Sequence, residues 1–325
     1  MGTLVPVAGM VPVGAHIFAD RYTYFPLIGV LIAVVWSAAE LSAGWRNRTA
    51  LLSALAAATL LGCLAATRAQ LRYWRDSEHL YHHTLEIMPD NYVAQNGLGL
   101  YLASHRRLDE AIECYRAALR INPLYDDAYS NLGRALAELG DLPQAAALFE
   151  TALRLQPGDV KTRNNLGDVL ILQGRYREAA GQFSEVLRLQ PDYFRARNNL
   201  ALCWRKLGRT EEAIAQYRAA IRLQPTFFEA INNLAWILAA GTDARFRNGP
   251  QAVTLATQAC DLTRYQNPVA LATLAAAYAE ISRFPEAVAL AEQARDMTAA
   301  RPGPLTARLS AMIDNFRAGQ PYHAD

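Results

Sequence analysis

Five prolines recur at a fixed spacing of 34 residues, and this period constrains the fold of most of the chain. They are Pro89, Pro123, Pro157, Pro191 and Pro225. When each repeat is counted from the third residue after its proline, position 7 is always leucine and position 8 is glycine or alanine. Over the first four repeats, position 20 is alanine and position 24 is tyrosine or phenylalanine. Such a period is typical of a solenoid, in which each repeat is one supersecondary unit that packs on its neighbours.

The columns within one repeat predict a pair of antiparallel α-helices. Positions 7, 8 and 11 share one face of a first helix, here called helix A, and positions 20, 24 and 27 share one face of a second, helix B. Small residues at positions 8 and 20 let the two helices approach closely, and the aromatic residue at position 24 fills the space beside them. Glycine then ends helix A in three repeats, at Gly140, Gly174 and Gly208.

This pattern resembles the tetratricopeptide repeat over residues 92–227. The resemblance implies an all-α fold, a right-handed superhelix of helix pairs. A fifth repeat starts at Phe228 and carries an insertion at residues 241–249, and a sixth starts at Pro268. We therefore expect a solenoid of about six repeats over residues 92–299, a capping helix and tail over 300–325, and a linking helix over 68–91.

The first fifth of the chain differs in composition from the rest. Residues 1–67 contain five charged side chains, whereas the remaining 258 residues contain 57. Two weakly polar stretches, 26–44 with the single acid Glu40 and 49–67 with no charge, are each 19 residues long and approach the length that crosses a bilayer as helix. We expect a transmembrane hairpin over residues 26–67, and an apolar or interfacial remnant of a membrane domain over 1–25. The alternative is two buried helices of a soluble protein, such as a co-chaperone.

A short motif before the first run, Asp20-Arg21-Tyr22-Thr23-Tyr24-Phe25-Pro26, is typical of a membrane–water boundary. It also resembles a segment of the transmembrane and tetratricopeptide-repeat-containing protein O-mannosyltransferases and their bacterial relatives, and residues 71–78 resemble the junction into their repeats. That resemblance implies a polytopic glycosyltransferase that uses a lipid-phosphate sugar donor, with acidic catalytic residues after its first span.

No segment matching that catalytic loop occurs in this sequence, so the resemblance assigns no catalytic residue to it. We expect Met1 to be an internal start within a longer parent protein, and the chain alone to lack transferase activity. Asp20 and Arg21 are candidates for contact with a lipid phosphate. The simpler interpretation is an ion pair or a headgroup anchor. A lipid-linked sugar is expected only for the longer parent.

The orientation in the membrane receives opposing indications. Counting arginines in the short flanking segments favours repeats on the cytoplasmic side. The family resemblance implies repeats in the periplasm or lumen, and we adopt this second interpretation for a multi-pass membrane protein.

The inner wall of the solenoid is expected to carry a ladder of asparagines from helix A. Position 6 supplies Asn131, Asn165, Asn199 and Asn233, and Asn96 stands at position 5 of the first repeat. An amide offers both donor and acceptor, so an array of amides can bind the backbone of an extended peptide. Helix packing is the alternative role of these side chains. Arg163 and Arg195 lie nearby and could pair with an acidic segment, or simply face solvent.

Other chemistries find little support. The formal charge of +2 is too small for nucleic-acid binding. His79, His82 and His83 have helical metal-ligand spacing but no second element to close a site, so neither metal nor cofactor is expected. No arrangement for nucleophilic catalysis is present, and the four cysteines are expected to act as small apolar residues.

The sequence therefore predicts a membrane-anchored scaffold that contacts lipid and binds an extended segment of a partner protein. The alternative is the C-terminal part of a lipid-phosphate-sugar-dependent protein O-glycosyltransferase whose repeats present the acceptor protein.

Overall fold

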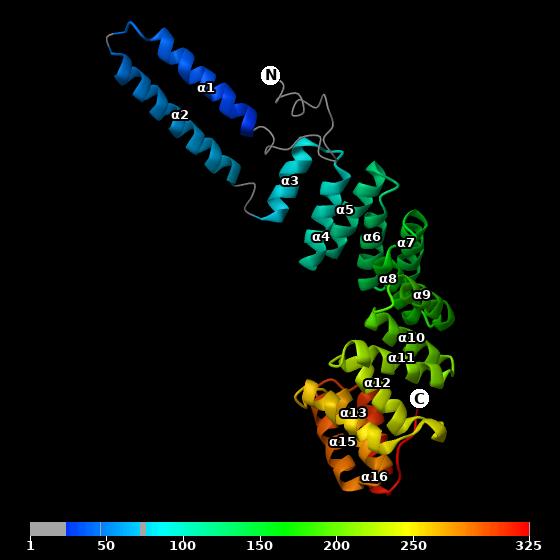
Figure 1. Cartoon of the computed structure of the whole chain (residues 1–325). Helices are drawn as coiled ribbons and strands as arrows, with labels where there is room; N and C mark the ends of the chain where they lie inside the picture. The colour runs from blue at the N-terminus through cyan, green and yellow to red at the C-terminus, as the bar shows by residue number, and fades with distance from the viewer. Residues whose placement is uncertain (1–23, 46, 72–75, 325) are drawn as a thin grey trace. The chain divides into compact units, whose positions relative to one another are not determined.

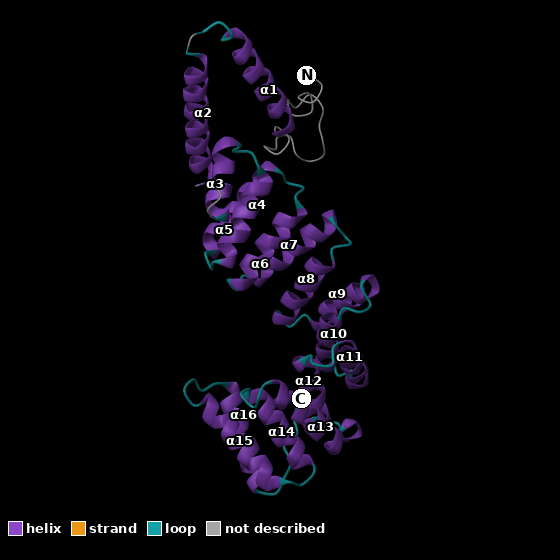
Figure 2. Cartoon of the chain, turned by 60° about the vertical axis from the view of Figure 1, so that its left-hand side comes forward, coloured by secondary structure: helices purple, strands orange, loops and turns teal. Residues whose placement is uncertain are grey.

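The computed structural model describes residues 24–45, 47–71 and 76–324 (Figure 1). Within these ranges the chain forms sixteen α-helices and one 3-10 helix. Figure 2 shows these helices joined by loops, with no strand in the described ranges. The predicted all-α class is confirmed. The chain divides into two compact units, residues 1–80 and 81–325, and each is described by itself. Asp20 and Arg21 lie outside the described residues.

The first unit holds α1 (Tyr24–Leu41), α2 (Arg48–Leu71) and the start of α3 (Ser77–Ile87). In the described part of the chain, only the segment Arg48–Arg68 of α2 is long and apolar enough to cross a membrane. Large apolar side chains stand exposed on both helices, including Trp36 on α1 and Leu60 on α2. Exposed apolar surface of this extent is typical of contact with lipid or with another protein.

The second unit is a stack of helix pairs that follows the predicted register. The A helices are α4 (Tyr92–Ser104), α6 (Asp126–Glu138), α8 (Val160–Leu172), α10 (Phe194–Lys206), α12 (Phe228–Ala240) and α14 (Pro268–Glu280). The B helices are α5 (Leu108–Ile121), α7 (Leu142–Leu155), α9 (Tyr176–Leu189), α11 (Thr210–Leu223), α13 (Gly249–Leu262) and α15 (Phe284–Thr298). The capping helix is α16 (Pro304–Arg317).

The small residues at position 8 let the aromatic ring at position 24 lie against the backbone of helix A. A Cβ atom added to Gly167 would lie 2.6 Å from the Phe183 ring, and one added to Gly99 would lie 2.6 Å from the Tyr115 ring. The position-24 rings and the position-20 alanines of the first four repeats are buried. A different contact involves position 6 of the first A helix, because a Cβ added to Gly97 would lie 2.5 Å from the Tyr81 ring of α3. Within the second unit, Tyr81 and Leu85 of α3 pack against the core of the first repeats.

The turn from helix A to helix B requires a left-handed residue. Gly174 has φ +74°, a conformation that glycine adopts without strain. Arg106 takes the equivalent place in the first repeat with φ 64°. Several A and B helices then begin with a side-chain cap, such as Asp141, whose carboxylate accepts from the amide of Gln144 at 3.2 Å.

The predicted insertion interrupts the fifth repeat between α12 and α13. It contains a short 3-10 helix, η2 (Ala244–Phe246). α16 packs on α15, with Leu309, Met312 and Phe316 buried. The chain then leaves α16 through Gly319 and returns toward α14 and α12, where its last described residues are bonded.

Candidate functional site

The candidate site is a strip of polar side chains along the A helices of the first five repeats. The position-5 asparagines are buried: Asn96, Asn164, Asn198 and Asn232. The position-6 asparagines are half-buried: Asn131, Asn165, Asn199 and Asn233. The 34-residue register places each set at one position of successive A helices.

Several of these amides bond to one another across repeats. Asn131 donates from Nδ2 to Oδ1 of Asn96 at 3.0 Å, and Asn233 donates from Nδ2 to Oδ1 of Asn198 at 3.3 Å. These bonds tie helix A of one repeat to helix A of the next, which is the packing role weighed above. Each donating amide uses one of its two N–H groups, so each keeps a donor for a ligand.

An acidic residue, Asp168 at position 9 of α8, breaks the amide pattern. Its carboxylate accepts from Nδ2 of Asn199 at 2.7 Å and from Nδ2 of Asn164 at 2.9 Å. Burial raises the pKa of Asp168 to about 6, although the two amide hydrogen bonds and the charge of Arg195 oppose that rise. A half-buried carboxylate that holds two amides is a strong acceptor for a further N–H group.

Asn165 differs from the other position-6 asparagines. Its counterpart at position 5 of the preceding repeat is Ser130, whose hydroxyl instead pairs with the Thr162 hydroxyl at 2.6 Å. Among the described residues the Asn165 side chain has no hydrogen bond, and Oδ1 of its buried neighbour Asn164 has no partner either. Unused hydrogen-bonding capacity therefore lies on α8, beside Asp168, and also at Asn232 on α12, whose buried Oδ1 has no partner among the described residues.

The two predicted arginines have different surroundings. Arg163 on α8 connects its helix to α9 and to the preceding turn, because it donates to Oε1 of Gln182 at 3.0 Å and to the carbonyl of Pro157 at 2.7 Å. Arg197 repeats this arrangement one period later with Gln216 and Pro191. Arg195 is exposed, its guanidinium lies 5.8 Å from the Phe194 ring centre, and no ion pair holds it within the described chain. Arg195 is thus the arginine left available to an anionic group.

The remaining candidates of the sequence form no site. His79 pairs with Asp76 at 2.8 Å on the surface, and the described residues contain no group of three or more metal-ligating side chains. Cys203 and Cys260 are buried, and burial raises the pKa of each thiol to about 12. Cys63, by contrast, is exposed on α2.

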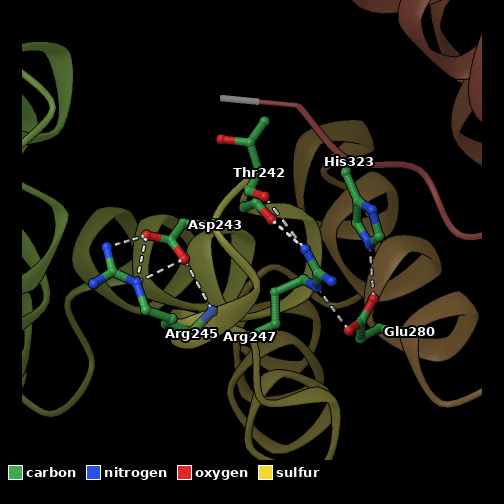
Figure 3. A network of polar contacts seen from close by, with 7 residues as sticks. Thr242, Asp243, Arg245, Arg247, Glu280 and His323 are labelled. Atoms are coloured by element: carbon green, nitrogen blue, oxygen red, sulfur yellow. Dashed lines mark hydrogen bonds and ion pairs between the residues drawn. The ribbon is translucent and has the colours of Figure 1, made fainter.

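Sequence reasoning gave no role to position 9, whose residue type changes from repeat to repeat. It holds Asp168 in α8 and Trp236 in α12. The sequence pattern also gave no indication of the network around Glu280, which joins the insertion to the tail (Figure 3). The signal that could have pointed to Asp168 and Trp236 is that position 9 varies between repeats, whereas the positions just before it are nearly constant.

Comparisons with known proteins agree with the repeat assignment. A family model described as tetratricopeptide repeat matches residues 50–126, 96–160 and 164–226, and a second model of that description matches 139–182. The first of these matches begins within α2. The protein O-mannosyl-transferase Tmtc2 of Drosophila melanogaster is 30% identical over 121 residues, which cover 37% of this chain and 12% of that protein. The match thus spans only about an eighth of the length of that relative.

Two solved structures share the fold. The Cut9–Hcn1 hetero-tetramer of the APC/C matches with a TM-score of 0.59 at 15% identity, covering 73% of this chain and 45% of that chain. YrrB, described as a TPR protein with an unusual peptide-binding site, matches with a TM-score of 0.50 at 21% identity, covering 59% of this chain and 95% of that chain.

Proposed function

Because this chain belongs to the tetratricopeptide-repeat family and is therefore a scaffold of the protein-interaction type, we propose that it binds an extended segment of a partner protein along its A helices. The observation that carries this proposal is the group on α8 and α10 formed by Asn165, Asp168 and Arg195. It combines a free amide, a half-buried acceptor and an exposed cation.

Each member of the group suits a different part of a peptide. Asn165 can donate to a backbone carbonyl and accept from a backbone N–H, independently of sequence. Asp168 accepts one further N–H, and Arg195 pairs with a carboxylate of the ligand. The strip is extended by the second N–H groups of Asn131, Asn199 and Asn233. Asn96 belongs to the strip as well, because it accepts the hydrogen bond of Asn131. Since one such bond contributes about 0.5–1.5 kcal/mol net, binding requires several together.

Peptides selected from a displayed random library on the detergent-solubilised chain would test this proposal. For a selected peptide, we expect Asn165→Ala, Asp168→Asn and Arg195→Ala each to raise the Kd by roughly two- to tenfold. Asn315→Ala on α16 is the control, because it removes a half-buried amide outside the strip. Unchanged affinity in all three strip variants, with helical content retained, would reject the strip as the binding site.

The proposed anchor is the pair α1 and α2, as a transmembrane hairpin over residues 26–67. The exposed apolar side chains and the length of α2 support it. We further propose that the repeats lie on the periplasmic or lumenal side and that Asp20 and Arg21 contact lipid phosphate. Extraction by alkaline carbonate, without detergent, would contradict the anchor.

A second candidate function is that the chain is the repeat-bearing part of a protein O-glycosyltransferase. The 30% identity to Tmtc2 over 121 residues favours it. In this case the strip would present the acceptor protein to a catalytic part carried elsewhere. An upstream reading frame that continues in phase and encodes further spans and an acidic loop would support it, and an in-frame stop codon directly before Met1 would exclude it.

A further inference from the structure

The two departures from the repeat pattern meet each other in the structure. One is the insertion at residues 241–249, and the other is the segment 320–324 that follows the capping helix, here called the tail segment. Figure 3 shows Glu280, at the end of α14, between Arg247 of the insertion and His323 of the tail segment.

The tail segment is bonded to α12 through its main chain, in the manner of a bound peptide. The amide of Ala324 donates to the carbonyl of Ala240 at 2.8 Å. The carbonyl of Ala324 accepts from Nε1 of Trp236 at 3.2 Å. Both polar groups of one residue are thus satisfied by α12, and such main-chain bonds give affinity without requiring a particular sequence.

Side chains add selectivity to this contact. The Glu280 carboxylate lies 2.9 Å from Nε2 of His323 and 3.1 Å from Nε of Arg247. Arg247 is itself fixed, because it donates to the carbonyl of Gly241 at 3.1 Å. The insertion therefore holds Glu280 in place for a group on the tail segment.

The Trp236 ring is covered from two sides. Its centre lies 6.5 Å from that of the Tyr322 ring, and the Arg308 guanidinium lies 5.4 Å from the Trp236 ring centre. Only 8% of Trp236 remains exposed. Trp236 stands at position 9 of α12, the position that Asp168 holds in α8, so the tail segment lies on the helix face that carries the polar strip.

A pocket continues from the end of the tail segment toward the fourth repeat. Its lining includes Ala324, Trp236 and Thr242, together with Arg205 and Thr210 of the fourth repeat. Nε of Arg205 is buried and has no hydrogen-bond partner among the described residues. Arg205 nevertheless lines the pocket as a cation, and this charge suits a carbonyl or carboxylate of a chain that runs further in the same direction.

From these contacts we propose that α12 and α14 form a second peptide site, that the tail segment occupies it as a built-in ligand, and that its removal opens the site. The site takes an extended peptide with an aromatic residue, then histidine or another N–H donor, then a small residue. It does not include Asn165, Asp168 or Arg195, and it does not depend on the function proposed for those three residues.

The test compares the intact chain with a variant that stops before Pro321, both solubilised in detergent. This variant keeps Gln320, whose amide bonds the carbonyl of Asn315 at 2.9 Å and closes α16. The probe is a fluorescein-labelled peptide with the sequence of residues 318–325. We expect the shortened chain to bind it saturably, and the intact chain to bind it at least about tenfold more weakly, since a short tether gives the tail segment a millimolar effective concentration.

Peptide variants separate specific binding from misfolding, because they leave the protein unchanged. Replacing the tyrosine or the histidine of the probe by alanine should each lower its affinity for the shortened chain severalfold. In the protein, Glu280→Gln should lower it too, whereas Glu286→Gln, which alters an exposed carboxylate paired with Arg283 on α15, should not. Asn165→Ala should leave probe binding unchanged.

No saturable binding to the shortened chain up to about 10 mM peptide, with its helical content intact, would overturn the proposal. Equal affinity for the shortened and intact chains would overturn it as well, because the tail segment would then not occupy the site.

Discussion

Replacing Asp168 by asparagine should change how the stability of the third and fourth repeats depends on pH. The pKa of this carboxyl is about 6 in the folded chain, where burial disfavours its charge, and about 4 when unfolded. The folded state therefore binds the proton more tightly than the unfolded state does. The stabilisation this provides is fully present below about pH 4 and is lost as the pH rises through about 6.

The magnitude follows from the two pKa values. Over the whole range they correspond to about 3 kcal/mol, of which about 1 kcal/mol is lost between pH 5 and pH 7. Asparagine has no charge to bury and therefore avoids this loss. It also offers one acceptor where the carboxylate offers two, but the Asn164 amide can turn so that its unpartnered Oδ1 accepts from the new NH₂ group.

Amide hydrogen exchange measured on α8 and α10 provides the assay, since local opening free energies are defined even where a solenoid does not unfold in two states. We expect the opening free energy of the parent chain to fall by about 1 kcal/mol relative to Asp168→Asn between pH 5 and pH 7. Asp192→Asn, at an exposed turn before α10, is the control. Parallel pH profiles for the parent and Asp168→Asn would refute the assigned burial of this carboxyl.

Three further predictions concern packing, backbone conformation and the anchor. Gly167→Ala should destabilise α8 and α9 by about 1–3 kcal/mol in thermal unfolding, because its Cβ would lie 2.6 Å from the Phe183 ring. Its matched control Gly181→Ala, with open space around it, should stabilise α9 by up to about 1 kcal/mol; equal effects would contradict this packing. Gly174→Ala should lower the stability of its turn by about 1 kcal/mol or more, because φ is +74° there, whereas Arg106→Gly at φ 64° should lower the stability of its turn by nothing. Hydrogen exchange of the amides in both turns measures the two effects. In open membrane sheets, a water-soluble maleimide should leave Cys63 on α2 unmodified, whereas it should modify the cysteine of a Lys161→Cys variant at an exposed position. Equal rates of modification at the two cysteines would place α2 in water.

The repeat helices could be predicted closely because each is specified several times over. Helices α4, α6, α8, α10 and α12 all begin at position 1 of the register. In each of these repeats leucine recurs at position 7 and a small residue at position 8, and the first four also share an aromatic ring at position 24. The asparagine columns can be read from the sequence, and helix packing was the alternative role considered for them. The hydrogen bonds that join these amides across repeats could not be predicted from the sequence.

The groups that distinguish this solenoid from others could not be predicted in the same way. Asp168 and Trp236 occupy position 9, where the repeats differ, so no recurrence points to them. The contact of the tail segment joins Trp236 to Ala324 across 88 residues, and residues 318–324 carry no periodic pattern. Such contacts depend on the curvature of the stack, which only the folded structure provides.

The bond between the tail segment and α12 also changes how cooperatively the solenoid should behave. A linear array of repeats resembles a one-dimensional chain in which each unit senses only its nearest neighbours, so its ends fray independently of its middle. By returning from α16 to α12, the tail segment converts the last two repeats and the cap into a closed loop. These helices should then open together as one foldon, while the first four repeats open stepwise from the side of α4.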